Sequence, residues 1–121
     1  MLNYFCNVSK SKQIKPFLKW VGGKTKLLSE IEKNLPKELK KRKFIYAEPF
    51  LGGGAVFFHL VQNLNIEKAY LNDLNNKLID TYKHVRDKTP ELIQKLKKLE
   101  TDYYGSSDKK MFFLDQRENF N

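Results

Sequence analysis

The sequence predicts an α/β fold in which short strands alternate with helices. The first observation is the stretch 44–61, where an apolar run leads into Glu48-Pro49-Phe50, three glycines and a second apolar run of helical length. The second is the stretch 68–86, where a short run ends in Asn72-Asp73 and precedes apolar residues at helical spacing. This repeated order of strand, turn and helix is typical of βαβ units with parallel strands. Open sheets of this kind bind ligands at the carboxyl ends of their strands.

With 121 residues, the chain is long enough for one domain or for part of one. A hydrophobic share of 40% suffices for a core, and no apolar run approaches the ~20 residues of a membrane helix. The segment 1–15 lacks the charged-then-apolar order of a secretory signal, so we expect a disordered leader there. Cys6 is the single cysteine, which excludes a disulfide within the chain and favours a cytoplasmic protein. Because no long apolar run is present, we expect no membrane partner.

The net charge of +9 arises in one part of the sequence. Residues 1–43 hold 12 basic and 3 acidic residues, whereas residues 44–121 hold 11 of each. An uneven basic face suggests a polyanionic partner such as nucleic acid. Alternatively, the composition is simply rich in lysine, which accounts for 20 of the 23 basic residues, and the run Lys37–Lys43 is a solvated helix end. Charge alone leaves both interpretations open.

The first predicted unit is a glycine turn followed by a helix. The pair Gly22-Gly23 precedes Lys24, and apolar residues at helical spacing predict a helix from there to Pro36. Although Gly23-Lys24 resembles the end of a P-loop, the glycine that a P-loop needs five positions before Gly23 is replaced by Leu18. A cation at Lys24, an aromatic ring at Trp20 and a helix N-terminus suit a small anion attached to a flat ligand. Alternatively, Trp20 belongs to the core and Lys24 is solvated.

The second unit is the strand 44–47, which ends at Glu48 and continues into the glycine bend. Three consecutive glycines, Gly52–Gly54, allow a ligand to approach the backbone at the N-terminus of the next helix. The bend is not a dinucleotide fingerprint, because G-x-G-x-x-G would require a small residue at Phe57. A nucleotide-like ligand of another kind is therefore expected.

The third unit begins with the strand 68–71 and ends at Asp73. This residue lies 25 positions after Glu48, where an acid can accept both hydroxyl hydrogens of a ribose. Asp73 could instead cap the following helix. Because Asn75 also suits that role, Asp73 would be left for a ligand.

Helices are expected to complete the chain, at residues 76–86, from 89 to about 104, and from about 108 onward. Gly105-Ser106-Ser107 separates the last two. His59 and His84 stand on predicted helices without acidic or cysteine partners at metal-ligand spacing, so we expect packing or surface roles and no metal site.

Four segments in this order resemble the motifs of Dam-type DNA adenine-N6 methyltransferases, including the DpnII-like subgroup. They are Lys19-Trp20-Val21-Gly22-Gly23-Lys24, Glu48-Pro49-Phe50-Leu51-Gly52-Gly53-Gly54, Leu71-Asn72-Asp73-Leu74-Asn75 and Arg117-Glu118-Asn119-Phe120-Asn121. The resemblance covers residues 16–121 and implies a Rossmann-like S-adenosylmethionine-dependent methyltransferase fold, with an incomplete parallel sheet and flanking helices. Residues 16–104 would be the cofactor-binding part, and residues 105–121 would begin a helical target-recognition region.

The resemblance also implies S-adenosylmethionine as cofactor and double-stranded DNA as partner. Trp20 and Lys24 would border the methionine half of the cofactor, with Lys24 facing its carboxylate and Glu48 its cationic end. Phe50 and the glycines would form a wall, and Asp73 would hold the ribose hydroxyls. The expected cofactor-binding residues are Trp20, Gly23, Lys24, Glu48, Phe50, Gly52, Gly54 and Asp73.

The sequence departs from the family because it contains no Asp-Pro-Pro-Tyr catalytic motif. That motif would bind the adenine N6 amine and stack on the flipped-out base. We therefore expect the N-terminal portion of an enzyme, inactive alone, which is a truncated gene product, an artificially shortened piece, or one piece of a split gene with a separate C-terminal half. An exposed sheet edge would then favour aggregation or partial disorder.

Three hypotheses follow, in this order. The first is a site-specific DNA adenine methyltransferase, of a restriction-modification system, a phage or a housekeeping pathway. The second is a remnant that binds cofactor or nucleic acid without chemistry. The third is a basic nucleic-acid-binding domain of unrelated fold.

Overall fold

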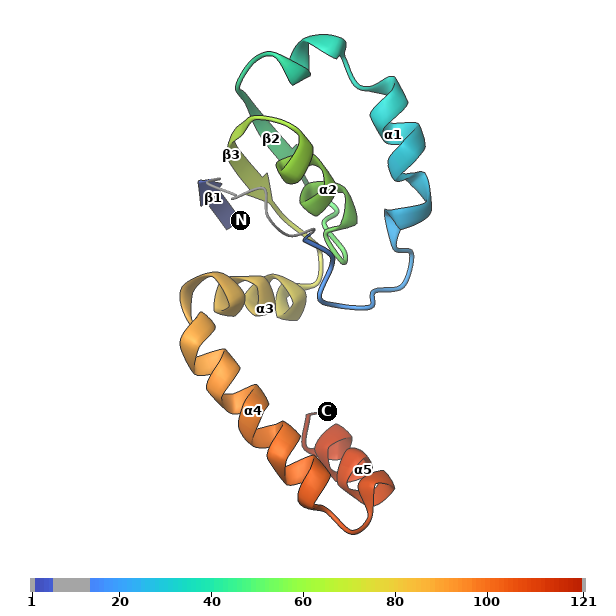
Figure 1. Cartoon of the computed structure of the whole chain (residues 1–121), viewed down its shortest axis with the longest axis vertical. Helices are drawn as coiled ribbons and strands as arrows, with labels where there is room; N and C mark the ends of the chain where they lie inside the picture. Colours follow the sequence, from blue (N-terminus) through green and yellow to red (C-terminus); the bar gives the residue numbers. More distant parts are fainter. Residues whose placement is uncertain (1, 6–13, 121) are drawn as a thin grey trace. The chain divides into compact units, whose positions relative to one another are not determined.

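The computed structural model describes Leu2–Phe5 and residues 14–120, and it divides into one unit that ends at Tyr82 and a second that starts at Lys83 (Figure 1). The first unit contains the strands β1 (Leu2–Phe5), β2 (Phe44–Glu48) and β3 (Ile66–Leu71). Its helical elements are η1 (Lys24–Leu27), α1 (Leu28–Asn34), η2 (Lys37–Lys40), α2 (Ala55–Asn63) and the first part of α3 (Asn76–Asp87). The second unit contains α4 (Thr89–Gly105) and α5 (Lys109–Phe120).

The sheet of the first unit has the order β1-β3-β2, and β2 and β3 run parallel. Glu48 is paired with Leu71, so the two parallel strands end side by side. Helix α2 connects them, which confirms the predicted βαβ unit and a mixed α/β architecture with flanking helices. Among the described residues, the parallel part of the sheet consists of these two strands.

Four residues of the segment 1–15, which we expected to be a disordered leader, are described as a strand. Leu2–Phe5 form β1, which pairs antiparallel with β3. The edge of β3 that faces away from β2 offers free N–H and C=O groups, and β1 pairs with them. Residues 6–13, including Cys6, lie outside the described residues, so the expectation for them stays a prediction.

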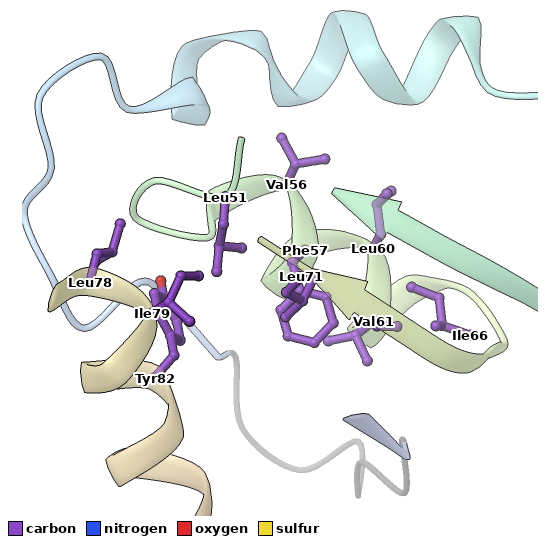
Figure 2. Packing of buried hydrophobic residues seen from close by; sticks show 11 residues of the cluster. Leu51, Val56, Phe57, Leu60, Val61, Ile66, Leu71, Leu78, Ile79 and Tyr82 are labelled. Carbon is purple, nitrogen blue, oxygen red and sulfur yellow. The ribbon is translucent and has the colours of Figure 1, made fainter. Parts of the chain in front are cut away.

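The core of the first unit lies between α2, the sheet and α3 (Figure 2). Alternating residues of β3 face it, and Ala69 and Leu71 are fully buried. The largest side chain in it is Tyr82 of α3, which is 1% exposed. The buried cluster consists of Leu51, Val56, Phe57, Leu60, Val61, Ile66, Ala69, Leu71, Leu78, Ile79 and Tyr82.

The helix predicted from Lys24 begins as the 3-10 turn η1 and becomes α-helical at Leu28. Its apolar residues Leu28, Ile31 and Leu35 are partly buried against the core, whereas Leu27 is 55% exposed. The helix ends at Asn34, shortly before Pro36, as the sequence indicates. Helix α1 therefore lies on the core without entering it.

The second unit is a pair of helices whose boundaries match the sequence. Helix α4 begins at Thr89 with a proline in its first turn and ends at Gly105. Asp108 caps α5, because its Oδ1 accepts hydrogen bonds from the backbone N–H groups of Lys110 and Met111. The rings of Tyr103 and Phe112 join the two helices with centroids 5.9 Å apart. Within the described ranges, no helix is both long and apolar enough to cross a membrane.

Candidate functional site

The glycine bend extends the pairing of β2 and β3 beyond the ends of both strands. Asn72 donates its backbone N–H to the carbonyl of Glu48, and Leu51 donates to the carbonyl of Asn72, each at 2.9 Å. Gly54 then begins α2 with a φ of +73°. A Cβ at Gly54 would lie 2.8 Å from the hydroxyl oxygen of Tyr82, so only glycine fits without a shift. The bend therefore has one tightly determined path at the edge of the sheet.

Asp73 ties this bend to the loop after β3. Its Oδ2 accepts a hydrogen bond from the N–H of Gly52 at 2.8 Å, and its Oδ1 accepts one from the N–H of Asn75 at 3.0 Å. Asn75 in turn accepts a bond from the N–H of Leu78 at 3.1 Å. Asn75 is thus the side chain that caps α3, as the sequence indicated. Each oxygen of Asp73 retains a further lone pair for a ligand.

Lys24 and Glu48 are in direct contact with each other. Lys24 Nζ lies 2.8 Å from Glu48 Oε1 and also donates to the carbonyl of Phe50. Glu48 is 6% exposed, and its Oε2 accepts a hydrogen bond from the hydroxyl of Tyr46 at 2.9 Å. Burial, together with the adjacent carboxylate, raises the pKa of Tyr46 far above its usual value. The sequence had suggested opposite ends of a ligand as partners for Lys24 and Glu48, whereas here each is the partner of the other.

A cavity of about 190 Å³ opens at the carboxyl ends of β2 and β3. Its lining residues are Trp20, Val21, Gly22, Gly23, Lys24, Phe50, Leu51, Gly52, Gly53, Ala55 and Asp73. Of the eight residues expected to bind a cofactor, Glu48 and Gly54 do not line the cavity. Glu48 is bonded to Lys24, which does line it, and Gly54 is buried at the start of α2. The structure therefore brings the two glycine turns and Asp73 together at one place.

Trp20 forms one side of this cavity and is not a core residue. The residue is 39% exposed. A Cβ added to Gly52 would lie 3.4 Å from Trp20 Cδ1, and one added to Gly53 would lie 3.3 Å from the carbonyl oxygen of Leu18. The segment around Trp20 therefore packs closely over the glycine bend.

Sequence reasoning missed two tyrosines that support the site. The hydroxyl of Tyr82 donates a hydrogen bond to the carbonyl of Gly52 at 3.3 Å. The centroids of the Phe17 and Tyr82 rings lie 5.1 Å apart. In the sequence, Tyr82 falls in the helix expected at residues 76–86 and Tyr46 in the strand 44–47, and neither position by itself indicates a role in the site. The signal for both was a hydroxyl on an inward-facing aromatic residue, since such groups find hydrogen-bond partners. The lining residues outside the eight expected ones, Val21, Gly22, Leu51, Gly53 and Ala55, adjoin them in sequence.

Apart from Lys24 and Asp73, no charged residue in the described part of the first unit lines the cavity. The basic run Lys37–Lys43 precedes β2 and so lies at the opposite end of that strand. His59 Nε2 lies 3.1 Å from Glu32 Oε2, an acidic partner on α1 that sequence spacing did not reveal. No cluster of three or more potential metal ligands occurs in the part of the chain that the structure describes.

Comparisons with known proteins identify related chains. The model of the D12 class N6 adenine-specific DNA methyltransferases matches residues 20–121. The chain is 44% identical to the Type II methyltransferase M.MjaIII of Methanocaldococcus jannaschii over 112 residues, which are 90% of this chain and 39% of that protein. It is 36% identical to the Type II methyltransferase M1.LlaDCHI of Lactococcus lactis subsp. cremoris, across 88% of this chain and 33% of that protein. A DNA adenine methylase of Serratia marcescens is also 36% identical, across 91% of this chain and 36% of that protein.

The chain thus spans about a third to two fifths of the length of these relatives. No solved structure matches it significantly.

Proposed function

The chain belongs to the D12 class N6 adenine-specific DNA methyltransferases, and we propose that it is the cofactor-binding portion of such an enzyme. The cofactor would be S-adenosylmethionine, and the acceptor would be adenine N6 in a short site of duplex DNA. The observation that carries the proposal is that Asp73, the glycine bend and Lys24 line one cavity at the carboxyl ends of two parallel strands. A Rossmann-like fold is part of this proposal.

Asp73 would hold the ribose of the cofactor. Its two oxygens already accept hydrogen bonds from the N–H groups of Gly52 and Asn75, so the carboxylate has one orientation. Each oxygen has another lone pair, which suits the two hydroxyl groups of a ribose. The carboxylate and the glycine bend would therefore act as one preorganised element.

Lys24 and Glu48 would receive the amino-acid end of the cofactor. Their charges are complementary to a carboxylate and an ammonium group, respectively. Gly22 and Gly23 lie beside them and leave the backbone accessible. The charges available at this end of the cavity thus suit a zwitterion.

Trp20 and Phe50 would form the walls around the cofactor. Phe50 is 73% exposed, so its ring is available for contact with a ligand. The cavity of about 190 Å³ is smaller than the ~300–1,000 Å³ typical of complete ligand pockets. In an intact enzyme, other parts of the protein would supply the remaining wall.

The bound cofactor would supply a methyl group on a positively charged sulfur. The residues of this chain would bind and orient that cofactor. The 121 residues contain no Asp-Pro-Pro-Tyr sequence, which in this family would bind the target base. We expect this chain to bind the cofactor without transferring its methyl group.

Calorimetric titration of the chain with S-adenosylmethionine tests the proposal. We expect saturable binding at one site, competition by S-adenosylhomocysteine and loss of binding in Asp73→Ala. Glu67→Gln is a matched control, because Glu67 is an exposed acid on β3 that does not line the cavity. A folded chain that shows no saturable binding would contradict the proposed function.

A further inference from the structure

We propose that Gln62 is a positioning residue for the cavity: it fastens the segment 14–20 to α2 and thereby holds Trp20 over the glycine bend. This segment, residues 14–20, is called the strap below. Gln62 does not line the cavity, and it lies roughly 10 Å along the helix axis from Ala55, which does. It would therefore act through the strap and not by touching a ligand. Its effect on cofactor affinity rests on the function proposed above.

The side-chain amide of Gln62 bonds to both backbone polar groups of Ile14. Its Oε1 accepts a hydrogen bond from the N–H of Ile14 at 2.6 Å, and its Nε2 donates to the carbonyl of Ile14 at 2.9 Å. The same Nε2 also donates to the carbonyl of Phe58, four residues earlier in α2. An amide nitrogen has two N–H donors, so both of these bonds can form together. The bond to Phe58 orients the amide on its own helix, and the start of the strap is fixed relative to α2.

Between its two ends the strap has one ring contact with the body of the unit. The Phe17 ring meets the rings of Phe58 and Tyr82 edge to face, with centroids 6.4 and 5.1 Å away, yet Phe17 remains 46% exposed. Among the described residues, no hydrogen bond other than those between Ile14 and Gln62 joins residues 14–19 to the rest of the first unit. Gln62 therefore supplies the directional contacts that hold the strap.

The far end of the strap lies on the glycine bend. A Cβ at Gly53 would lie 3.3 Å from the carbonyl oxygen of Leu18, 3.4 Å from Trp20 Cβ and 4.0 Å from Pro16 Cβ. Alternate residues of the strap thus approach one glycine, as in an extended segment. Trp20 is the residue of the strap that lines the cavity. The position of the strap on the bend therefore determines where this wall of the cavity stands.

Loss of the two bonds would release the strap at Ile14 and allow Trp20 to leave the bend. Two ordinary hydrogen bonds favour the fastened strap by roughly tenfold or more. A ligand that needs Trp20 in place binds only the fraction of molecules with a fastened strap, and its apparent affinity falls with that fraction. We expect Gln62→Leu to weaken binding of S-adenosylmethionine by roughly three- to tenfold.

The fluorescence of Trp20 tests the position of the strap without any ligand, because Trp20 is the single tryptophan. Quenching by acrylamide should increase in Gln62→Leu, since Trp20 is 39% exposed while the strap is fastened. Asn63→Leu is the matched control: the Asn63 amide donates to the carbonyl of His59, four residues earlier, as Gln62 does to that of Phe58. Quenching in this control should equal that of the wild type. Circular dichroism shows whether each variant is folded.

Calorimetry with S-adenosylmethionine tests whether the strap controls the cofactor site. Asn63→Leu should bind within about twofold of the wild type, because it leaves the strap fastened. In a Trp20→Ala background, Gln62→Leu should cost little further affinity, since both changes act through the same contact. Gln62→Glu is a second variant: at neutral pH its carboxylate has no donor for the carbonyl of Ile14. It should also increase quenching and weaken binding.

The inference is overturned if folded Gln62→Leu or Gln62→Glu shows the quenching of the wild type, or if Asn63→Leu changes quenching and affinity as much as Gln62→Leu does. It is also overturned if Gln62→Leu weakens binding by the same factor with and without Trp20, because Gln62 would then act independently of the strap. A folded wild type that binds no S-adenosylmethionine contradicts the proposed function, and the quenching of Trp20 then decides the inference about Gln62 by itself.

Discussion

The carboxylate of Asp73 holds the glycine bend in place, because its Oδ2 accepts a hydrogen bond from the backbone N–H of Gly52 at 2.8 Å. On the other side of the bend, the hydroxyl of Tyr82 donates to the carbonyl of the same glycine at 3.3 Å. Both backbone groups of Gly52 are therefore bonded to side chains that follow β3. The shape of the cavity depends on these contacts as much as on the glycines themselves.

Gly54→Ala should destabilise the chain by about 1–3 kcal/mol, the usual cost of a side chain in the left-handed region. The φ of +73° and the approach of the new Cβ to the Tyr82 hydroxyl at 2.8 Å both oppose the substitution. Urea unfolding followed by circular dichroism measures the change. In a Tyr82→Phe background the loss should be smaller, because the nearest atom is removed. Equal losses in both backgrounds would show that the hydroxyl contact contributes nothing.

Tyr46→Phe should lower the free energy of unfolding by about 1.5–3 kcal/mol, since a buried carboxylate loses a hydrogen-bond donor. The bond concerned joins the Tyr46 hydroxyl to Glu48 Oε2 at 2.9 Å. Tyr70→Phe is the control, because Tyr70 is a partly buried tyrosine of β3, the neighbouring strand. If both variants lose the same free energy, the Tyr46 bond has no special role.

Stability should also fall as the pH rises above about 10, the usual pKa of tyrosine. Burial and Glu48 raise the pKa of Tyr46, so the folded chain keeps this proton while the unfolded chain releases it. The unfolded state then binds fewer protons, and the free energy of unfolding decreases by up to about 1.4 kcal/mol per pH unit. Below this range Tyr46 contributes no pH dependence. Tyr46→Phe should flatten the alkaline slope in denaturant titrations, and an unchanged slope would contradict the assignment.

The basic run should be separable from the cofactor site. Replacing Lys40, Lys41 and Arg42 by glutamine should leave the affinity for S-adenosylmethionine within about twofold, because charges at the other end of β2 are screened. If the run contacts DNA phosphates, the same variant should show a smaller salt dependence of duplex binding by fluorescence anisotropy. Loss of cofactor binding in this variant would contradict the placement of the site at the glycine bend.

The purified chain should produce no N6-methyladenine in duplex DNA, even with saturating S-adenosylmethionine. Its 121 residues contain no Asp-Pro-Pro-Tyr sequence to hold the target base. Mass spectrometry of digested DNA measures the product. Methylation by this chain alone would show that other residues form the base pocket.

The features that the sequence predicted well are those with local signals. The short strand that became part of β3, the glycines of the bend and the Asn75 cap all depend on neighbours within a few residues. The Lys24–Glu48 pair joins residues 24 positions apart, and the His59–Glu32 contact joins residues 27 apart. The first pair depends on how η1 lies against the end of β2, and the second on how α1 packs beside α2. The pairing of β1 was missed for the same reason, since it depends on a free edge of β3.

The most direct test of the central claim is a cycle that combines Asp73→Asn with removal of the ribose hydroxyl from the ligand. Calorimetry would compare S-adenosylhomocysteine with its 2′-deoxy analogue on the wild type, on Asp73→Asn and on the control Glu67→Gln. If Asp73 holds the ribose, removing the hydroxyl should cost the wild type and Glu67→Gln about tenfold or more in affinity, and Asp73→Asn much less. If all three proteins lose the same factor, Asp73 does not bind the ribose, and the proposed orientation of the cofactor is wrong.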